Sequence, residues 1–268
     1  MAEASGGLLP RRQLLEGSRR PQQLEAVIDA AECALRTWEP SWTGFLDGAA
    51  IEEAETRLGE LSELTLSRQG GFSGAERCCL LLQRSDNAVD PAALEAPLAG
   101  LEISGNFLFD PAEPDDVRAG LLDAGLPSEA IGDIWMRGDR GAQALVLQSC
   151  AAACHDREAL VRTVPVRLEV RRVEDLQLPA MRQPRRCQSV EASCRLDAVA
   201  SAGFGVSRSR MADWIRAGRV QINWEPVSTP SREVAAGDRV VISGRGALRI
   251  ETIEATRRNR WRVEMTRL

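Results

Sequence analysis

The sequence predicts an α+β protein with a helical N-terminal domain, a mixed middle domain and a small C-terminal α/β domain. Three observations support this prediction. Apolar side chains recur at three- and four-residue spacing in residues 22–37, which indicates a helix with one buried face. From residue 63 onward, short segments alternate apolar and polar side chains, as strands do. After residue 180 the charge balance changes from acidic to basic, which indicates a separate domain.

The change in charge is large. Residues 1–180 carry 17 Arg against 30 Asp and Glu, a balance of −13, whereas residues 181–268 carry 17 Arg against 9 Asp and Glu, a balance of +8. The chain as a whole has a net charge of −5. A basic surface confined to one domain is the usual electrostatic footprint of a polyanionic partner.

Residues 1–60 are predicted to form a helical N-terminal domain. The first helix covers residues 22–37, with Pro21 in its first turn and Pro40 just beyond its end. A second helix is predicted for residues 48–60, where acidic side chains near the start are favoured by the helix dipole.

The middle domain is predicted to cover residues 61–177. Strands are expected at residues 63–67, 77–83, 101–103, 131–136, 144–148 and 164–173. Helices are expected at residues 115–124 and 155–162. The strands on either side of the glycine-containing turn at 137–141 are expected to pair as a hairpin. This content predicts an α+β sandwich of the ferredoxin or RRM type.

Residues 178–188 are predicted to be a linker, because prolines and the arginines Arg182, Arg185 and Arg186 leave little apolar content. The C-terminal domain then covers residues 189–268. Its expected elements are helices at 193–202 and 208–217 and strands that begin near Val220 and Arg239.

The second helix of this domain has the features of a phosphate site. Ser207 is a suitable N-cap, and Arg208 and Arg210 lie in the first turn, where the helix dipole opposes positive charge. An anion bound to the free amides of the first turn would relieve this conflict. The alternative is a solvated basic face without a ligand.

Composition excludes several classes of enzyme. The chain contains no lysine and no tyrosine, so it has no Walker-A lysine, no Schiff-base lysine and no tyrosine acid. His155 is the single histidine. A zinc site built from Cys150, Cys154 and His155 would lack an evident fourth ligand, so buried thiols are preferred and we expect neither a metal nor a cofactor.

The sequence contains no apolar run of the roughly 18 residues that span a bilayer. The first ten residues lack the apolar core of a secretory signal. We therefore expect a cytoplasmic location without membrane insertion.

Four short motifs follow one another within the C-terminal domain: Arg195-Leu196-Asp197, Ser207-Arg208-Ser209, Ile215-x-x-Gly218-x-Val220-x-Ile222-Asn223 and Gly237-Asp238-x-Val240. Together they resemble the S4-type RNA-binding domain. The resemblance implies that the two-helix face binds structured RNA, with Leu196, Ile215 and Val220 in the core and Asp197 in a structural role. The candidate RNA-binding residues are Arg195, Ser207, Arg208, Ser209, Arg210, Arg219, Asn223, Trp224 and Arg245.

The resemblance extends beyond this domain. Gly70-Gly71-Phe72-x-x-Ala75-Glu76-Arg77 and Ile131-Gly132-Asp133-Ile134 resemble the YlmH family, which joins an RRM-like region to a C-terminal S4-type domain. It implies a large-subunit or tRNA-bound ribosomal partner and a part in the rescue of stalled nascent chains. Leu35-Arg36-Thr37-Trp38 is similar to the photosystem II S4 domain branch, which implies a role in photosystem II biogenesis. Family members carry His-Arg-Asp where this chain has the acidic segment 110–116, so no RNA contact is carried over there.

The sequence therefore predicts a non-catalytic RNA-binding protein that recognises rRNA or a ribosome–tRNA complex mainly by shape and phosphate contacts. The alternative is an RNA-modifying enzyme that uses the basic domain for docking. Arg195-Leu196-Asp197 is similar to the Gly-Arg-Leu-Asp motif of pseudouridine synthases, but here it follows Cys194. A third hypothesis, compatible with the first, is that the acidic N-terminal body binds a partner protein.

Overall fold

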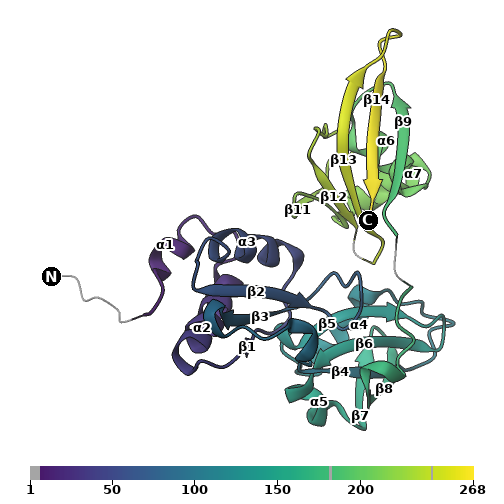
Figure 1. Ribbon diagram of the computed structural model, residues 1–268. Helices are drawn as coiled ribbons and strands as arrows, with labels where there is room; N and C mark the ends of the chain where they lie inside the picture. Colours follow the sequence, from purple (N-terminus) through teal and green to yellow (C-terminus); the bar gives the residue numbers. More distant parts are fainter. Residues whose placement is uncertain (1–6, 181–182, 243) are drawn as a thin grey trace. The chain divides into compact units, whose positions relative to one another are not determined.

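The computed structural model describes residues 7–180, 183–242 and 244–268, which fold into two compact units divided between Pro179 and Ala180 (Figure 1). Both units combine helices with antiparallel sheets, so the predicted α+β class is confirmed. Within the described residues, the first unit holds a three-stranded and a five-stranded sheet, and the second unit holds a six-stranded sheet.

The N-terminal part of the first unit packs helices on a small sheet. The helices are α1 (Arg11–Leu15), α2 (Pro21–Thr37) and α3 (Gly48–Leu58), and the sheet has the order β1 (Ser41–Trp42), β3 (Cys79–Arg84), β2 (Leu64–Gln69). The predicted helices at 22–37 and 48–60 are confirmed. Asp47 caps α3 by accepting a hydrogen bond from the Ala50 amide at 2.9 Å, as short polar side chains do at helix starts.

These helices do not form a domain that ends at residue 60. Leu24 and Ile28 of α2 and Leu58 of α3 share one buried cluster with Leu80 and Leu82 of β3. A helix with one apolar face needs a second layer to cover it, and β2 and β3 supply that layer. The predicted boundary at residue 60 thus separates elements that share a core.

The rest of the first unit is a five-stranded antiparallel sheet with two helices. The strand order is β5 (Ile131–Met136), β6 (Gly141–Leu147), β4 (Leu98–Ser104), β8 (Val164–Arg171), β7 (Arg157–Val161), and the helices are α4 (Pro114–Asp123) and α5 (Gln148–Cys154). Without β7, the succession β4-α4-β5-β6-α5-β8 and the order β5-β6-β4-β8 are those of a ferredoxin-like sheet. Short 3-10 turns occur at 85–87, 91–93, 128–130 and 173–175.

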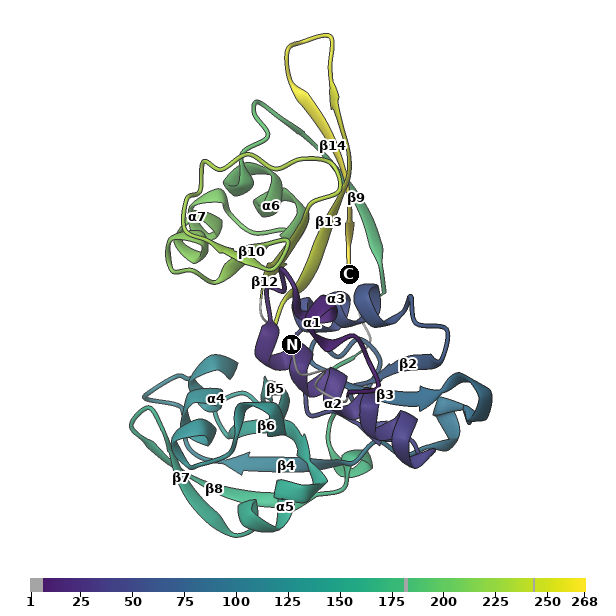
Figure 2. The same cartoon turned by 90° about the vertical axis from the view of Figure 1, so that its left-hand side faces the viewer.

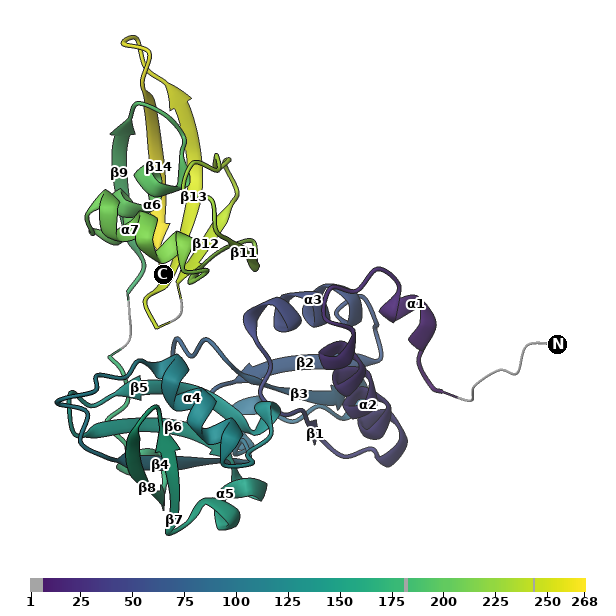
Figure 3. The same cartoon turned by 180° about the vertical axis from the view of Figure 1, so that it is seen from behind.

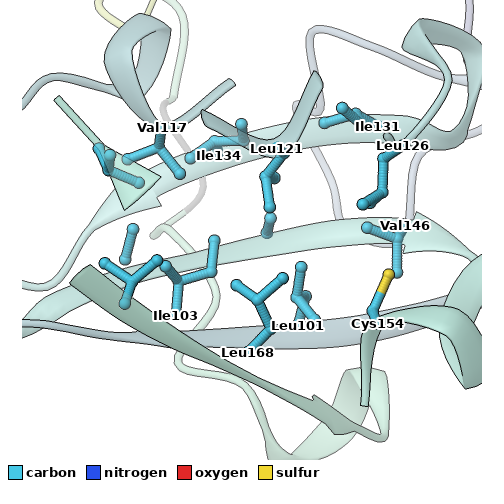
Figure 4. Packing of buried hydrophobic residues seen from close by; sticks show 14 of the residues in the cluster. Leu101, Ile103, Val117, Leu121, Leu126, Ile131, Ile134, Val146, Cys154 and Leu168 are labelled. Carbon is cyan, nitrogen blue, oxygen red and sulfur yellow. The ribbon is translucent and has the colours of Figure 1, made fainter. Parts of the chain in front are cut away.

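Both helices cover the same face of this sheet. Val117 and Leu121 of α4 and Cys154 of α5 lie in one buried cluster with Ile103 of β4 and Leu168 of β8 (Figure 4). These side chains are 0% exposed. Because buried side chains are closely packed, they fix the positions of α4 and α5 on the sheet.

The predicted helix at 155–162 is wrong. Residues 157–161 form β7, which pairs with β8 along its whole length. The helix of this region is α5, which starts seven residues before the predicted helix. Val161 is buried while Leu160 is 57% exposed, so the segment alternates like an edge strand. Arg162, at φ 56°, turns the chain between the paired residues Val161 and Val164.

The second unit is a single six-stranded sheet with two helices on one face (Figures 2 and 3). The strand order is β11 (Glu225–Val227), β10 (Val220–Ile222), β12 (Arg239–Ile242), β13 (Gly246–Ala255), β14 (Trp261–Arg267), β9 (Arg185–Glu191), and the helices are α6 (Leu196–Phe204) and α7 (Arg208–Arg216). The core joins Leu196 and Ile215 of the helices to Val220, Leu248 and Val263 of the sheet. The core roles expected for Leu196, Ile215 and Val220 agree with this cluster.

The predicted linker at 178–188 overlaps β9. Residues 185–188 pair with β14, whereas Arg182 lies outside the described residues. The sequence predicts a linker here because β9 is an edge strand with mostly exposed, polar side chains. The long β13–β14 hairpin was not predicted either.

Candidate nucleic-acid interface

The start of α7 is built as the sequence predicts. Gly205 adopts a left-handed conformation with φ 67° and ends α6, so that Ser207 can cap α7 two residues later. The Ser207 hydroxyl oxygen accepts a hydrogen bond from the Arg210 amide at 3.3 Å, and it lies 3.2 Å from the Ser209 hydroxyl. Both serines and both neighbouring arginines therefore surround the N-terminus of α7.

Asp197 holds two of the candidate arginines in place. The Arg195 guanidinium donates to both carboxylate oxygens of Asp197 at 3.1 and 3.0 Å, and Arg208 donates to Oδ1 at 3.1 Å. Asp197 is 5% exposed, whereas the side chains of Arg195 and Arg208 are 38% and 54% exposed. Burial raises the pKa of Asp197, but the hydrogen bonds and charges of the two arginines outweigh it and the pKa lies below its ordinary value.

This pairing changes the electrostatic argument for Arg208. Its charge, which opposes the dipole of α7, is offset by the Asp197 carboxylate inside the domain. An external anion is therefore not needed to stabilise Arg208. The two guanidiniums nevertheless keep solvent-exposed donors, which a phosphate oxygen can reach.

Three other candidate arginines converge on one aromatic ring. The guanidinium carbons of Arg245, Arg210 and Arg219 lie 4.5, 5.1 and 5.9 Å from the centre of the Trp214 ring. These distances are within the range of cation–π contact. Arg210 lies on α7, Arg219 follows α7, and Arg245 lies in the turn between β12 and β13, so three segments meet at Trp214.

Trp214 is not among the candidate RNA-binding residues that the sequence indicates. Trp214 is 8% exposed and packs in the core, but its ring also orients three positive charges. The four-residue spacing of Arg210 and Trp214 on a helix is the local signal for this contact. The contribution of Arg245 has no such signal, because it comes from a distant turn.

Asn223 and Trp224 form the turn of a tight hairpin. Ile222 and Glu225 pair across it, and both turn residues have positive φ values of 50° and 69°. Two consecutive left-handed residues in a two-residue loop define a type I′ turn. The Arg239 guanidinium carbon lies 4.6 Å from the centre of the Trp224 ring.

The Asn223 side chain is engaged within the domain. Its Nδ2 donates to Asp238 Oδ1 at 2.8 Å, and its Oδ1 accepts from the Arg239 amide at 2.9 Å. Asn223 thus ties the turn at 223–224 to the start of β12. Asn223 therefore helps to position the turn that carries Trp224.

Among the residues described in the first unit, none forms an open aromatic platform on the five-stranded sheet. The face opposite α4 and α5 is covered by a cluster that includes Leu145, Leu176 and Phe45. Gln143, in the middle of this face, is 4% exposed, and its Oε1 accepts hydrogen bonds from Trp135 Nε1 and the Gln177 amide at 3.2 and 2.9 Å. Base stacking on that face would require these side chains to leave.

The two motifs of the first unit meet in one partly buried junction. The Asp133 carboxylate accepts hydrogen bonds from the Glu76 and Arg77 amides at 2.7 and 3.0 Å. Arg77 donates to the carbonyl oxygens of Ile131 and Phe45 at 2.9 and 3.1 Å. Burial raises the pKa of Asp133 and lowers that of Arg77. These motif residues therefore join β5 to two segments, the one before β3 and the one before α3.

The acidic segment 110–116 is likewise engaged within its unit. Asp110 accepts hydrogen bonds from Arg162 Nε at 2.8 Å and from the Thr163 hydroxyl at 2.6 Å. These hydrogen bonds, with the charge of Arg162, lower the pKa of Asp110. The loop is thereby fixed to the β7–β8 turn.

In the described part of the chain, no group of three His, Cys, Asp or Glu side chains could hold a metal ion. Cys154 Sγ donates to the Cys150 carbonyl at 3.2 Å, and His155 Nδ1 accepts from the Val170 amide at 3.3 Å. The same residues include no helix that is long and apolar enough to cross a bilayer.

Comparison with known proteins agrees with this architecture. Residues 194–240 match the S4 domain family, and residues 20–87 match the family described as YlmH, N-terminal. The chain is 28% identical over 226 residues to the Ribosome-associated protein quality control protein P2 of Bacillus subtilis (strain 168), covering 84% of this chain and 86% of that protein. The solved structure of the cell division protein ylmH from Streptococcus pneumoniae is 18% identical, covers 66% of this chain and 100% of its own, and superposes with a TM-score of 0.45.

The second unit, with its two helices and basic first turn of α7, therefore contains an S4 domain. The chain thus combines a match to the YlmH N-terminal family in its first unit with a match to the S4 domain family in its second unit. The YlmH match ends at residue 87, just beyond β3, which agrees with a core that α2 and α3 share with β3.

Proposed function

We propose that the chain is a non-catalytic RNA-binding protein that binds the large ribosomal subunit in the cytoplasm through its S4 domain. The observation that carries this proposal is the convergence of Arg210, Arg219 and Arg245 on Trp214 of α7. This gives a surface of positive charge that α7, the segment after it and the turn before β13 hold in a fixed shape, as recognition of phosphates on folded RNA requires. The 28% identical ribosome-associated relative supports a ribosomal partner.

Three groups of side chains have distinct roles in this proposal. Arg195 and Arg208, fixed by Asp197, donate to phosphate oxygens with their exposed nitrogens. Ser207 and Ser209 donate from hydroxyls at the same helix end. Trp224, held by the Asn223 turn, offers a ring for stacking on an unpaired base.

Two features argue against the pseudouridine synthase alternative. Asp197, the residue that would correspond to a catalytic aspartate, is 5% exposed and bound by two guanidiniums. A nucleophile needs an open approach to its substrate, which such a carboxylate lacks. We expect the Asp197→Asn variant to leave uridines in bound RNA unchanged, and loss of a pseudouridine would revive the enzymatic alternative.

The link to photosystem II biogenesis stays a prediction based on residues 35–38. In the structure the Arg84 guanidinium carbon lies 3.6 Å from the centre of the Trp38 ring. Trp38 caps the C-terminus of α2 in a left-handed backbone conformation. This contact explains Trp38 as a structural residue of the first unit.

Co-sedimentation with large ribosomal subunits of Bacillus subtilis tests the proposal. We expect the wild-type chain to associate at about 50 mM salt and to be released at about 300 mM, because phosphate contacts weaken steeply with salt. The affinity of the double variant Arg208→Glu, Arg210→Glu for the subunit should be lower by roughly a hundredfold or more. The matched control is Arg167→Glu, Arg171→Glu in the first unit, which changes the net charge equally and should bind as wild type. Equal binding by both variants would contradict the site.

A further inference from the structure

The tip of the β13–β14 hairpin carries a second basic cluster, separate from α7. Arg257, Arg258, Arg260 and Arg262 lie within six residues of sequence, and all four are exposed. Figures 1 and 2 show this tip at the end of the unit away from α7. It lies outside residues 194–240, over which the S4 family matches.

The turn at the tip is well defined by hydrogen bonds. The Thr256 amide donates to the Arg260 carbonyl at 2.7 Å, and the Arg260 amide donates to the Thr256 hydroxyl at 3.2 Å. Asn259, at φ 53°, takes the left-handed position, and Ala255 and Trp261 pair below the turn. The arginines are therefore presented from a closed turn on a paired hairpin.

The charges of this cluster are not balanced by carboxylates. Across the described residues, no acidic side chain forms an ion pair with any of the four guanidiniums at the tip. Elsewhere exposed arginines do pair, as Arg167 does with Asp156 at 2.9 Å and Arg172 with Asp175 at 3.1 Å. Four like charges at one end of the hairpin, three in the turn and Arg262 at the start of β14, repel each other, and a bound polyanion would reduce that repulsion.

These side chains line an open groove of about 750 Å³, together with Val190 of β9 and Glu254 of β13. With one carboxylate against four guanidiniums, the groove is strongly cationic. Trp261, next to the groove residues in sequence, is 38% exposed. Arginine forms bidentate contacts with phosphate, and a shallow basic groove suits an extended backbone better than a small ligand.

The separation of the two basic clusters follows from β13. Arg245, in contact with Trp214, immediately precedes this strand, and the hairpin tip follows its last residue. Ten residues at about 3.3 Å each place the clusters about 30 Å apart along the strand. A single RNA phosphate group cannot contact both.

We propose that the hairpin tip is a second binding site for the phosphate backbone of RNA, which contacts a segment different from the one at α7. This inference rests on the proposed function, since both clusters would bind the same RNA. Arg257, Arg258, Arg260 and Arg262 supply the phosphate contacts, and the closed turn holds them in one groove.

The test uses the full chain, with large ribosomal subunits of Bacillus subtilis as the probe. The variant replaces Arg257, Arg258, Arg260 and Arg262 with Gln. Each phosphate contact contributes about 0.7 to 0.9 to the slope of log affinity against log salt, so we expect the slope to fall by about 3. Affinity at about 0.15 M salt should fall roughly tenfold or more. The matched control replaces Arg162, Arg167, Arg171 and Arg172 with Gln, and its slope should not change.

The outcomes separate this inference from the proposed function. If Arg208→Glu, Arg210→Glu abolishes binding while the hairpin variant keeps the wild-type slope, the S4 site stands and the hairpin site is overturned. If the hairpin variant loses slope while the α7 variant does not, the site at α7 fails and the hairpin site stands. Vesicles of phosphatidylglycerol are the third probe: their binding, lost in the hairpin variant with RNA binding unchanged, would assign the tip to a membrane surface and overturn the proposal. Unchanged thermal unfolding of the variant confirms that it folds.

Discussion

Asp197 shows how one buried carboxylate can organise a basic surface. It is the common acceptor for Arg195, which precedes α6, and Arg208, which begins α7. The helices are thereby joined at the end where RNA is proposed to bind. Replacement of Asp197 should therefore affect both the stability of the domain and the placement of two guanidiniums.

We expect Asp197→Asn to lower the free energy of unfolding of the second unit by about 1 to 2 kcal/mol at pH 7, because charge-assisted hydrogen bonds to half-exposed arginines are weakened. The folded pKa of Asp197 is lowered, so its contribution is present above the unfolded pKa of about 3.9 and is lost as pH falls through the folded pKa. Urea unfolding at pH 7, 5 and about 3 should show the difference between wild type and variant disappearing only at the lowest pH. A constant difference across this range would show that the carboxylate charge is not the cause.

The individual residues of the site differ in how far sequence alone can place them. Ser207 was predicted as the cap of α7 because capping depends on neighbours three residues away. The sequence does not predict the cluster at Trp214, because Arg245 reaches the ring only through the pairing of β10, β12 and β13. The RNA contact of Asn223 stays a prediction, and the sequence does not indicate its hydrogen bonds to Asp238 and Arg239 within the domain.

At the scale of elements, the junction of β2, β3 and β5 depends on Asp133. Its carboxylate accepts from two backbone amides that precede β3. Gly132, the residue before it, lies so close to Phe45 that an added Cβ would be 2.6 Å from the ring. The two halves of the first unit are therefore fitted together at this point.

Asp133→Ala should destabilise the first unit by about 1 to 2 kcal/mol, since the exposed Glu76 amide and the part-buried Arg77 amide lose their acceptor. The control is Asp139→Ala in the exposed turn between β5 and β6, where we expect a change of at most about 0.5 kcal/mol. Urea unfolding followed by tryptophan fluorescence measures both. Equal stability of the two variants would mean that the junction does not hold the unit together.

The long amphipathic helix α2 was the most predictable element, because its apolar spacing continues for four turns. For the short strand β7 the sequence predicts a helix, since five residues are too few to distinguish the two periods. For the edge strand β9 it predicts a linker, because the side chains of β9 are mostly polar. Pairing with β14, which decides its structure, cannot be read from β9 alone.

For the whole molecule, the change in charge at residue 180 coincides with a structural division. The two units meet at Pro179 and Ala180, and the second has its own core of helix and sheet residues. The sequence could find this division because composition differs on its two sides. It placed a boundary at residue 60 where there is none in the packing, because a helical segment and the strands that cover it differ in period but share one core.

We expect residues 180–268 to fold without the rest of the chain, since their buried cluster includes no residue of the first unit. The fragment should unfold cooperatively with temperature and show mixed helix and strand in circular dichroism. It should retain the salt-dependent binding of the full chain, whereas residues 1–179 should not bind. A fragment without a cooperative transition would contradict the independence of the unit.

Trp224 also bears on how this turn tolerates mutation. A left-handed tryptophan is strained by about 1 kcal/mol or more relative to glycine, which favours this conformation in type I′ turns. The codon for tryptophan differs from one glycine codon by a single nucleotide, so the relaxed turn is one substitution away. The change to glycine would relieve the backbone strain but would also remove the ring that lies against Arg239. The stacking role proposed for Trp224 gives a reason other than backbone strain for a tryptophan at this position.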